Sequence, residues 1–391
     1  MNQPSPTTQQ ADVLIIGGGL AGLALGIELA PFCKVAVIER YSYPMHRVCG
    51  EYVSLESWPY LEELGVPLGD LGLPIINQLR MSSAGGATME SKLPLGGFGI
   101  SRYLLDDLLQ QRFTALGGIL HTNTTVTNVI LDADGSFSIT TSEGNWQAKL
   151  VAGAWGKRSQ MDKVVGRNYS ETGNAKNFVG VKYHVTANLP TNGIELHTFN
   201  GGYAGISKVE GTTESTFCLC YLTKAENLQK HGGIAGMEEA VLHQNKNLKQ
   251  YLTHFPKLWD KPETIAQITF KPKPLIENGI FTLGDAAGMI TPLCGNGMSI
   301  ALHGAAILAP VLYQILKSPQ EKEALTNKYI SNWKASFSLR LSAGRILQNA
   351  VLNDSLNSGA FRLLQGLPFL KQPVIRLTHG KPYHSHMPKL G

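Results

Sequence analysis

Apolar residues are most continuous near the start of the chain. Residues 13–16 form an unbroken apolar run, which is typical of a strand buried on both faces of a parallel sheet. Residues 20–30 are nearly all apolar and predict a helix that is buried on most of its surface. A second short apolar run follows at 35–38. This order of strand, helix and strand predicts a βαβ unit.

The rest of the chain separates into strand-like and helical segments. Residues 298–316 approach the length of a membrane span but contain His303, Pro310 and Gln314, so we expect a buried core helix there. The other predicted helices cover 55–64, 101–116, 237–252 and the region after 329. The predicted strands cover 75–100 (two or three strands), 124–130, 136–141, 147–152, 179–185, 216–221, 266–270 and 280–283.

A glycine motif joins the first strand to the first helix. Gly17, Gly19 and Gly22 have the G-x-G-x-x-G spacing. The first glycine is expected to make a tight turn, the second to let the backbone approach a pyrophosphate, and the third to let helix and strand pack closely. Glu39 ends the second strand, where a carboxylate can accept hydrogen bonds from a ribose. These features in register predict a dinucleotide site at the helix N-terminus.

A second glycine-rich segment lies much later in the chain. Asp285 follows a buried strand in the run GDAAG. The residues that open the next apolar helix include Pro292, Gly295, Gly297 and Met298. A carboxylate at this place can bind a sugar-like hydroxyl, and the helix N-terminus offers N–H groups to an anionic or electron-rich ring.

The two motifs together resemble the flavoprotein superfamily of p-hydroxybenzoate hydroxylase, and within it the branch of geranylgeranyl reductases and flavin-dependent halogenases. The resemblance implies an α/β fold with a Rossmann-type FAD-binding domain, an inserted β-sheet substrate domain and a helical C-terminal region. The implied FAD-binding domain covers 11–75, 100–175 and 265–320, the substrate domain 76–99 and 176–264, and the C-terminal region 321–391.

The resemblance also implies which residues bind FAD. The glycine motif would hold the pyrophosphate, Glu39 the adenosine ribose and Asp285 the ribityl chain, while the segment after Asp285 would border the isoalloxazine ring. Arg102 matches the family arginine that reaches the phosphates or the ribityl chain; the alternative is an exposed arginine in a first helical turn. The full expected set is Gly17, Gly19, Gly22, Glu39, Arg40, Arg47, Arg102, Asp285, Pro292, Gly295, Gly297 and Met298.

The loop after Glu39 supplies the candidate catalytic groups. Cys49, Glu51 and Tyr52 stand in a Cys-Gly-Glu-Tyr segment that resembles the cysteine-glycine segment beside the flavin in the reductases. A cysteine there could tune the flavin or donate a proton, with the acid and the phenol as further polar groups. The alternative is a small buried thiol that only packs.

Several departures from the superfamily narrow the function. Trp155 stands where the family's mid-chain Ala-Asp-Gly motif has its aspartate, so a nicotinamide contact is missing. Gly288 follows Gly-Asp-Ala-Ala, as in geranylgeranyl reductases, whereas hydroxylases often have a histidine there. The halogenase W-x-W-x-I-P motif is absent. A single G-x-G-x-x-G motif indicates that NADPH or NADH visits transiently, or that a separate reductase protein reduces the flavin.

The leading interpretation is therefore an FAD-dependent, NAD(P)H-dependent monooxygenase acting on a hydrophobic aromatic, polyketide-like or isoprenoid small molecule. The alternative enzyme is a geranylgeranyl-reductase-like C=C reductase or a dehydrogenase. A non-enzymatic flavin-binding protein and an NAD-dependent dehydrogenase rank lower. Aromatic residues at 178, 183, 199, 203, 217 and 221 would line an apolar pocket over the flavin, or would be ordinary sheet core.

Composition adds limits on partners and location. A net charge of +5 over 391 residues gives no nucleic-acid footprint. Five scattered cysteines without paired metal spacing indicate reduced thiols and a cytoplasmic location. We expect no metal site at these cysteines, and none at His384 and His386 near the C-terminus. The polar N-terminal residues do not resemble a signal peptide. Positive charge is denser near the C-terminus, so peripheral contact with an anionic membrane is an alternative to a solvated face.

Overall fold

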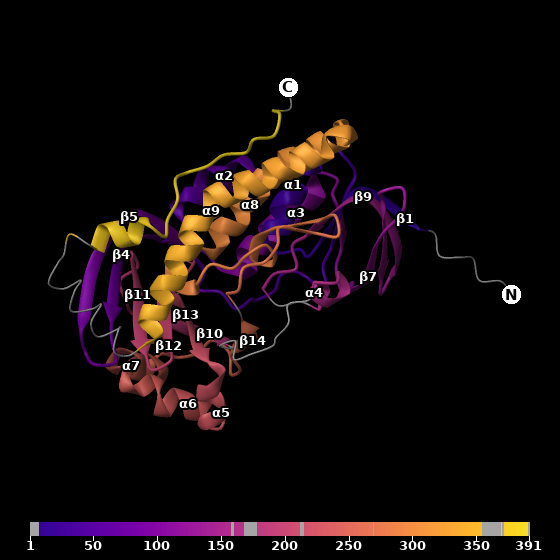
Figure 1. The fold of residues 1–391 in the computed structure, drawn as a ribbon. Coiled ribbons are helices and arrows are strands. Elements are labelled where there is room, and N and C mark those ends of the chain that lie inside the picture. Colours follow the sequence, from indigo (N-terminus) through magenta and orange to yellow (C-terminus); the bar gives the residue numbers. More distant parts are fainter. Residues whose placement is uncertain are drawn as a thin grey trace.

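The structure is a computed structural model, and it describes residues 8–157, 160–167, 178–211, 215–268, 270–353, 369 and 371–389. Two β-sheets with helices packed on them, crossed by a long C-terminal helix, make up this part of the chain (Figure 1). This is the predicted α/β fold with a β-sheet domain and a helical C-terminal region. The predicted domain boundary at 175–176 and the basic residue Arg362 lie outside the described residues.

The first sheet carries the predicted βαβ unit. Its central strand is β1 (Gln9–Ile16), which pairs in parallel with β2 (Val35–Ile38) on one side and β9 (Gly144–Gly153) on the other. The first strand has Leu14 and Ile15 fully buried, as expected for a parallel strand covered on both faces. The full order is β15 (Ile276–Glu277), β16 (Ile280–Thr282), β9, β1, β2 and β6 (Ile119–His121), with the hairpin of β7 (Val126–Leu131) and β8 (Phe137–Thr141) attached to β9.

Three helices cover one face of this sheet. Helix α1 (Leu20–Leu29) is buried along its whole length and packs between α3 (Arg102–Ala115) and α8 (Gly297–Lys317). The Ser101 side chain accepts a hydrogen bond from the Leu104 N–H, which confirms the predicted N-cap of α3. Among the described helices, α8 alone is long and apolar enough to cross a membrane, but 67% of its most apolar stretch is buried inside the fold. The core-helix interpretation fits this burial.

The second sheet brings together strands from distant parts of the chain. Its order is β14 (Glu263–Ile268), β10 (Phe178–Thr186), β13 (Thr216–Lys224), β12 (Gly202–Lys208), β11 (Gly193–Phe199), β4 (Ile75–Ser82), β5 (Thr88–Gly99) and β3 (Tyr52–Ser54). One face is covered by α5 (Ala225–Lys230), α6 (Ile234–Ala240) and α7 (Lys246–His254), which lie beneath the sheet in Figure 1. The opposite face turns toward the first sheet and its loops.

One helix prediction was wrong. The single helix predicted over 237–252 is instead α6, a short 3-10 turn and α7, because the Asn245 side chain accepts hydrogen bonds from the Asn247 and Leu248 N–H groups and so begins a new helix. The predicted helical C-terminal region contains α9 (Lys322–Leu352) and α11 (Lys371–Arg376) among its described residues. Beyond α11 the chain runs in an extended course over α8 and the short helix α2 (Trp58–Glu63), where Tyr383 is buried and donates to Ser57 Oγ.

Candidate flavin site

The first glycine motif has the geometry that its spacing predicts. Gly17 turns the chain after β1 with φ +107°, and a Cβ there would lie 2.5 Å from the Ala154 carbonyl oxygen. A Cβ on Gly22 would lie 2.0 Å from the Gly17 carbonyl oxygen, so helix and turn touch directly. Gly19 precedes α1 and provides no side-chain cap, and a Cβ there would lie 3.6 Å from Arg102 Nη2. The helix N-terminus therefore offers backbone N–H groups beside a cation, which suits a pyrophosphate.

Glu39 lies beside this turn, at the end of β2. Its buried carboxylate accepts hydrogen bonds from the Gly18 N–H at 2.8 Å and the Tyr41 N–H at 3.1 Å. Arg47 Nη2 is 3.2 Å from the same carboxylate. The structure thus brings together the acid predicted for the ribose and one of the two predicted loop arginines. Arg40 is exposed and stacks its guanidinium on Tyr41 at 4.6 Å from the ring centre.

Arg102 is fixed by a buried acid that the sequence did not single out. Its Nε and Nη2 donate to the two oxygens of Asp106, both at 2.7 Å, and the Asp106 side chain is fully buried. Arg47 Nε also lies 3.4 Å from Asp106. A bidentate pair of this kind holds a guanidinium in one orientation. Asp106 therefore orients Arg102 toward the glycine turn. The i, i+4 spacing of the two residues on α3 is the sequence signal that indicates this ion pair.

Replacing Arg102 by glutamine should weaken FAD binding about tenfold or more, because it removes a charge-assisted contact to phosphate and leaves Asp106 buried without its partner. The measurement is the FAD dissociation constant from fluorescence titration of the apoprotein. The matched control is Arg80→Gln on β4, an arginine whose side chain is 44% exposed and whose ion pairs are loose, 3.6 and 3.9 Å. A dissociation constant that is the same in both variants would contradict the assignment.

The second glycine segment lies against the first turn of α1, next to the first glycine motif. Gly284 has φ +61°, and a Cβ there would lie 3.0 Å from the Ala21 Cβ on α1. Asp285 follows in a 3-10 turn and is partly exposed. The buried guanidinium of Arg167 secures this turn by donating to the Ala286 carbonyl oxygen and to Thr282 Oγ1, both at 3.0 Å. Asp285 is therefore held at the edge of the first sheet, beside the helix that carries the phosphate-binding turn.

The residues predicted to border the isoalloxazine form the entry to α8. Gly295 is left-handed with φ +65°, and a Cβ there would lie 3.1 Å from the Tyr52 ring. Gly297 begins α8 with no side-chain cap, Met298 is buried and Pro292 is exposed. The structure therefore joins the second glycine segment to the loop of candidate catalytic residues. A helix N-terminus suited to a pyrophosphate, an acid placed where a ribose is expected, an oriented arginine and a second helix N-terminus are groups that fit FAD.

Side chains from β10, from β13 and from the segment after β9 contact three carbonyl groups of the loop before β3. Lys182 Nζ donates to the Arg47 carbonyl oxygen at 3.3 Å, and Lys157 Nζ donates to the Val48 carbonyl oxygen at 3.1 Å. The Cys218 thiol lies 3.3 Å from the Cys49 carbonyl oxygen. Three successive peptide groups of this loop are thus held by side chains of the second sheet and of the segment after β9, and these contacts position the loop.

Glu51 is the centre of this attachment. The residue is fully buried with φ +54°, and its carboxylate accepts from the Arg102 N–H at 2.8 Å and from Lys182 Nζ at 2.5 Å. The second oxygen lies 2.5 Å from His184 Nε2. Burial alone would raise the pKa of Glu51, but the hydrogen bond to His184 and the charge of Lys182 outweigh it and lower the pKa to about 2.

The contacts of Glu51 bear on its predicted catalytic role. A carboxylate that is ionised and already accepts three groups is suited to positioning rather than to proton donation. Lys182 and His184, which pair with it from β10, were missed in the sequence, although alternating apolar and charged residues in VKYHV were the available signal. His46 lies near the same carboxylate, and burial lowers its pKa to about 4.

Cys49 and Tyr52 differ in how deeply they are buried. Cys49 is half-buried and contacts the hydrophobic core. Tyr52 is 5% exposed, its ring packs against Gly97 and Gly295, and its hydroxyl has no hydrogen-bond partner among the described residues. Burial, with the charge of Glu56 added, raises the pKa of Tyr52 well above its usual range, so the phenol stays protonated. A buried hydroxyl without a partner beside Gly295 is a group that a bound ligand could satisfy.

The predicted aromatic pocket is divided between the two faces of the second sheet. Phe178 and Tyr203 lie on the face toward the flavin loops, in a cluster with Met289. Tyr203 also donates to Gln348 Oε1 and accepts from the Leu293 N–H, so it joins the sheet to the α8 entry. The other four aromatic residues are ordinary core between the sheet and helices α5–α7; they are Tyr183, Phe199, Phe217 and Tyr221.

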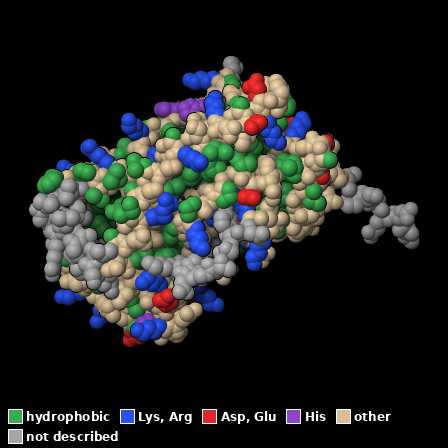
Figure 2. Space-filling model, in the orientation of Figure 1, with side chains coloured by type: hydrophobic (Ala, Val, Ile, Leu, Met, Phe, Trp, Pro, Cys, Tyr) green, Lys and Arg blue, Asp and Glu red, His purple; other side chains and the backbone are tan. Residues whose placement is uncertain are grey.

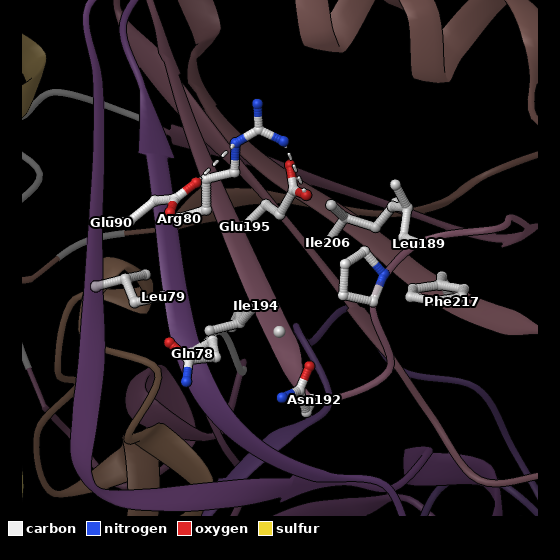
Figure 3. Close-up of a pocket in the computed structure, with 12 residues that line it drawn as sticks. Gln78, Leu79, Arg80, Glu90, Leu189, Asn192, Ile194, Glu195, Ile206 and Phe217 are labelled. Atoms are coloured by element: carbon white, nitrogen blue, oxygen red, sulfur yellow. Dashed lines mark ion pairs between the residues drawn. The ribbon is translucent and has the colours of Figure 1, made fainter.

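A separate hollow lies on β4 and β11, where Figure 3 shows Arg80 between Glu90 and Glu195. Its volume is about 230 Å³, and none of the predicted cofactor residues lines it. Its lining includes Leu189, Ile206 and Phe217. Because Ile206 and Phe217 belong to the core under α5–α7, this hollow opens on the face of the sheet that is turned away from the flavin loops.

Trp155, which replaces the aspartate of the family's Ala-Asp-Gly motif, is hydrogen-bonded to a nearby aspartate, Asp162. Its indole N–H donates to Asp162 Oδ1 at 3.1 Å, and the same oxygen lies 3.2 Å from Arg167 Nη1. Arg167 in turn fixes the turn that carries Asp285. The tryptophan therefore takes part in holding the second glycine segment, which gives this substitution a structural role.

Comparisons with known proteins agree with this geometry. A sequence model of the FAD binding domain family (FAD_binding_3) matches residues 10–334. The chain is 26% identical over 361 residues to "Conditioned medium factor receptor 1" of Dictyostelium discoideum, covering 83% of this chain and 68% of that protein. The flavin-dependent brominase Bmp2 superposes with a TM-score of 0.76 at 18% identity, covering 95% and 93% of the two chains. The structure of pqsL, a probable FAD-dependent monooxygenase from Pseudomonas aeruginosa, gives 0.71 at 17% identity, covering 90% of this chain and all of that chain (100%).

The family match spans both glycine segments and most of the second sheet, and the structural matches extend the same fold over nearly the whole chain. The structural matches show the fold, while the placement in the branch of geranylgeranyl reductases and flavin-dependent halogenases remains a prediction. The chain belongs to the FAD binding domain family, and its fold is that of the p-hydroxybenzoate hydroxylase-like flavoproteins.

Proposed function

We propose that the protein is an FAD-dependent monooxygenase that acts on a hydrophobic aromatic, polyketide-like or isoprenoid small molecule, with NADPH or NADH as a transient electron donor. The observation that carries the proposal is the meeting of the two glycine segments across α1, with Glu39 and Arg102 beside them. A probable FAD-dependent monooxygenase has the same fold, so the fold is compatible with this chemistry, and the labelling experiment below tests it.

When bound, FAD would supply electron transfer and oxygen activation. The chain's own residues would hold and enclose it. The α1 start and Arg102 would bind the phosphates, and Glu39 and Asp285 the sugar and ribityl hydroxyls. The N–H groups at the start of α8 would stabilise negative charge on the pyrimidine edge of the ring. Glu51 and Lys182 would keep the loop with Cys49 fixed above the ring, and Tyr52 would exclude water from that edge.

A C=C reductase or dehydrogenase of the geranylgeranyl-reductase type is the second candidate. Gly288 and the Cys49 loop favour it in the sequence. In the structure, a Cβ on Gly288 would lie 3.2 Å from the Trp333 ring, so packing against α9 is a sufficient reason for that glycine. A non-enzymatic flavin-binding protein remains the third reading, supported by the replacement at Trp155. A separate reductase as the donor would be compatible with any of the three.

Oxygen labelling separates the two enzyme candidates. The holoenzyme is incubated with NADPH, a panel of lipophilic aromatic and isoprenoid compounds and ¹⁸O₂, and the products are examined by mass spectrometry. Incorporation of one labelled oxygen atom per product is the expected result. A product reduced or desaturated without label would reject the monooxygenase proposal in favour of the second candidate.

Asp285→Ala should reduce FAD retention, because the variant loses ribityl hydrogen bonds that together contribute roughly 1–3 kcal/mol. The measurement is the flavin-to-protein absorbance ratio after gel filtration, with the FAD dissociation constant of the apoprotein. Asp285→Asn, which keeps one acceptor oxygen, should fall between the parent protein and the alanine variant. Full retention of FAD in Asp285→Ala would mean that this carboxylate does not bind the cofactor.

A further inference from the structure

The C-terminal part of the chain has a charge balance unlike the rest. Residues 324–391 contain nine Lys and Arg and a single acidic residue, Asp354. This segment therefore carries +8, whereas the whole chain carries +5, so residues 1–323 carry −3. Such asymmetry within one chain is typical of a surface that meets an anionic partner.

Exposed apolar side chains gather in the same segment. Leu339 and Ile346 on α9 are 68% and 70% exposed, and Phe369 and Leu377 beside α11 are 70% and 45% exposed. These four are part of a set of ten large hydrophobic side chains that are exposed among the described residues. Leu339 and Ile346 are seven residues apart and lie on one side of α9, two turns from each other.

Basic side chains without ion pairs flank these apolar residues. Lys328 and Lys334 are exposed on α9, Arg376 ends α11, and Lys381 follows it; no salt bridge is found for these four within the described residues. Figure 2, in the orientation of Figure 1, shows Lys and Arg side chains spaced along the course of α9 with hydrophobic side chains between them. We define the outward side of α9, with Lys328, Lys334, Leu339 and Ile346, as the basic-apolar face.

The inner side of α9 packs against the segment that leads into α8 and against the second sheet. Trp333 and Leu341 pack on Gly288, Gly344 lies against Thr291 and Cys294, and Gln348 accepts from Tyr203. α9 thus covers the segment that enters α8, where the isoalloxazine is expected. The basic-apolar face is the other side of the same helix, about one helix diameter, ~10 Å, from that segment.

We infer that the basic-apolar face docks on an anionic phospholipid surface. Apolar side chains would enter the boundary between head groups and acyl chains, while lysines and arginines at their sides would meet anionic head groups. A nucleic acid would satisfy the charge but leave Leu339 and Ile346 exposed to water. The inference goes beyond the proposed reaction and does not depend on it, and it would bring a lipophilic compound to a site directly behind α9.

Vesicle co-sedimentation of the full-length, FAD-loaded protein tests the inference. Vesicles of phosphatidylcholine with phosphatidylserine are compared with vesicles of phosphatidylcholine alone, at low and at high salt. Binding should require phosphatidylserine and weaken with salt, since each basic residue near the surface contributes about a fivefold factor in affinity, from roughly 1 kcal/mol. Equal binding to both vesicle types, or binding to neither, would overturn the inference.

Matched variants locate the surface. Leu339→Ser with Ile346→Ser, and separately Lys328→Gln with Lys334→Gln, should each reduce vesicle binding at least about tenfold. The controls are Ile130→Ser with Leu131→Ser on β7, exposed by 50% and 47%, and Lys230→Gln with Lys249→Gln on α5 and α7. Flavin absorbance verifies folding in every variant. Parent-like binding by both test variants, or an equal loss in the controls, would contradict the assignment of this face.

Discussion

Glu51→Gln should destabilise the protein by about 3–5 kcal/mol, because it leaves the Lys182 ammonium buried without its counter-charge. Both side chains of this pair are fully buried, and the same carboxylate holds the Arg102 N–H and His184. The measurement is the free energy of unfolding from denaturant titration of the apoprotein. The matched control is Glu90→Gln, whose side chain is 79% exposed and 3.9 Å from Arg80, and which should change stability by less than about 0.5 kcal/mol.

A double variant distinguishes the cost of an unpaired buried charge from other causes of lost stability. Glu51→Gln combined with Lys182→Met removes both charges and should recover part of the lost stability, since an unpaired buried charge is the main cost. Loss of the same size in the single and double variants would show that the pairing of Glu51 with Lys182 is not what stabilises the loop. Cys49 accessibility to thiol reagents would report loop release independently.

The same carboxylate predicts an acid dependence. The pKa of Glu51 is lowered from 4.5 to about 2, so its contribution to stability is present above pH 4.5 and is lost as the pH falls through 2. The parent protein should therefore lose stability between these values more steeply than Glu51→Gln. Parallel curves for the two proteins over this range would contradict the assignment.

Gly22→Val should abolish FAD binding and sharply reduce folded yield. A Cβ on this glycine would lie 2.0 Å from the backbone oxygen of Gly17, which cannot move aside without opening the turn. The valine would therefore separate α1 from the phosphate-binding turn. The control is Gly69→Ala, where a Cβ would have no atom within 4 Å. Flavin absorbance and circular dichroism of the purified variants provide the measurement, and a Gly22→Val protein that retains flavin would reject the close contact as a requirement.

The first βαβ unit could be predicted because the residues that determine it are consecutive in the sequence. Residues 9–39 contain strand, turn, helix, strand and acid in sequence order, and the structure reproduces them with Glu39 accepting a hydrogen bond from the Gly18 N–H. The second glycine segment was equally recognisable, since the turn at Asp285 depends on its own glycines. Neither motif required knowledge of the rest of the chain.

The parts that could not be predicted depend on contacts between distant segments. Glu51 meets Lys182 and His184 only when β10 is placed beside the flavin loop, more than a hundred residues later in the chain. The aromatic residues of the second sheet could not be assigned to a face before its strand order was known, because a shift of one residue moves a side chain to the other face. The break at Asn245 depended on a cap within an otherwise helical pattern.

The central claim is that the two glycine segments and Arg102 form an FAD site that serves a redox reaction. The most direct test is the visible spectrum of the purified, FAD-reconstituted protein under anaerobic conditions, before and after addition of NADPH or NADH. The account predicts bound-flavin absorption bands that bleach when the nicotinamide is added. Protein that binds no flavin after reconstitution would contradict the central claim, and bound flavin that neither nicotinamide nor a reductase protein can reduce would contradict the proposed oxidoreductase function.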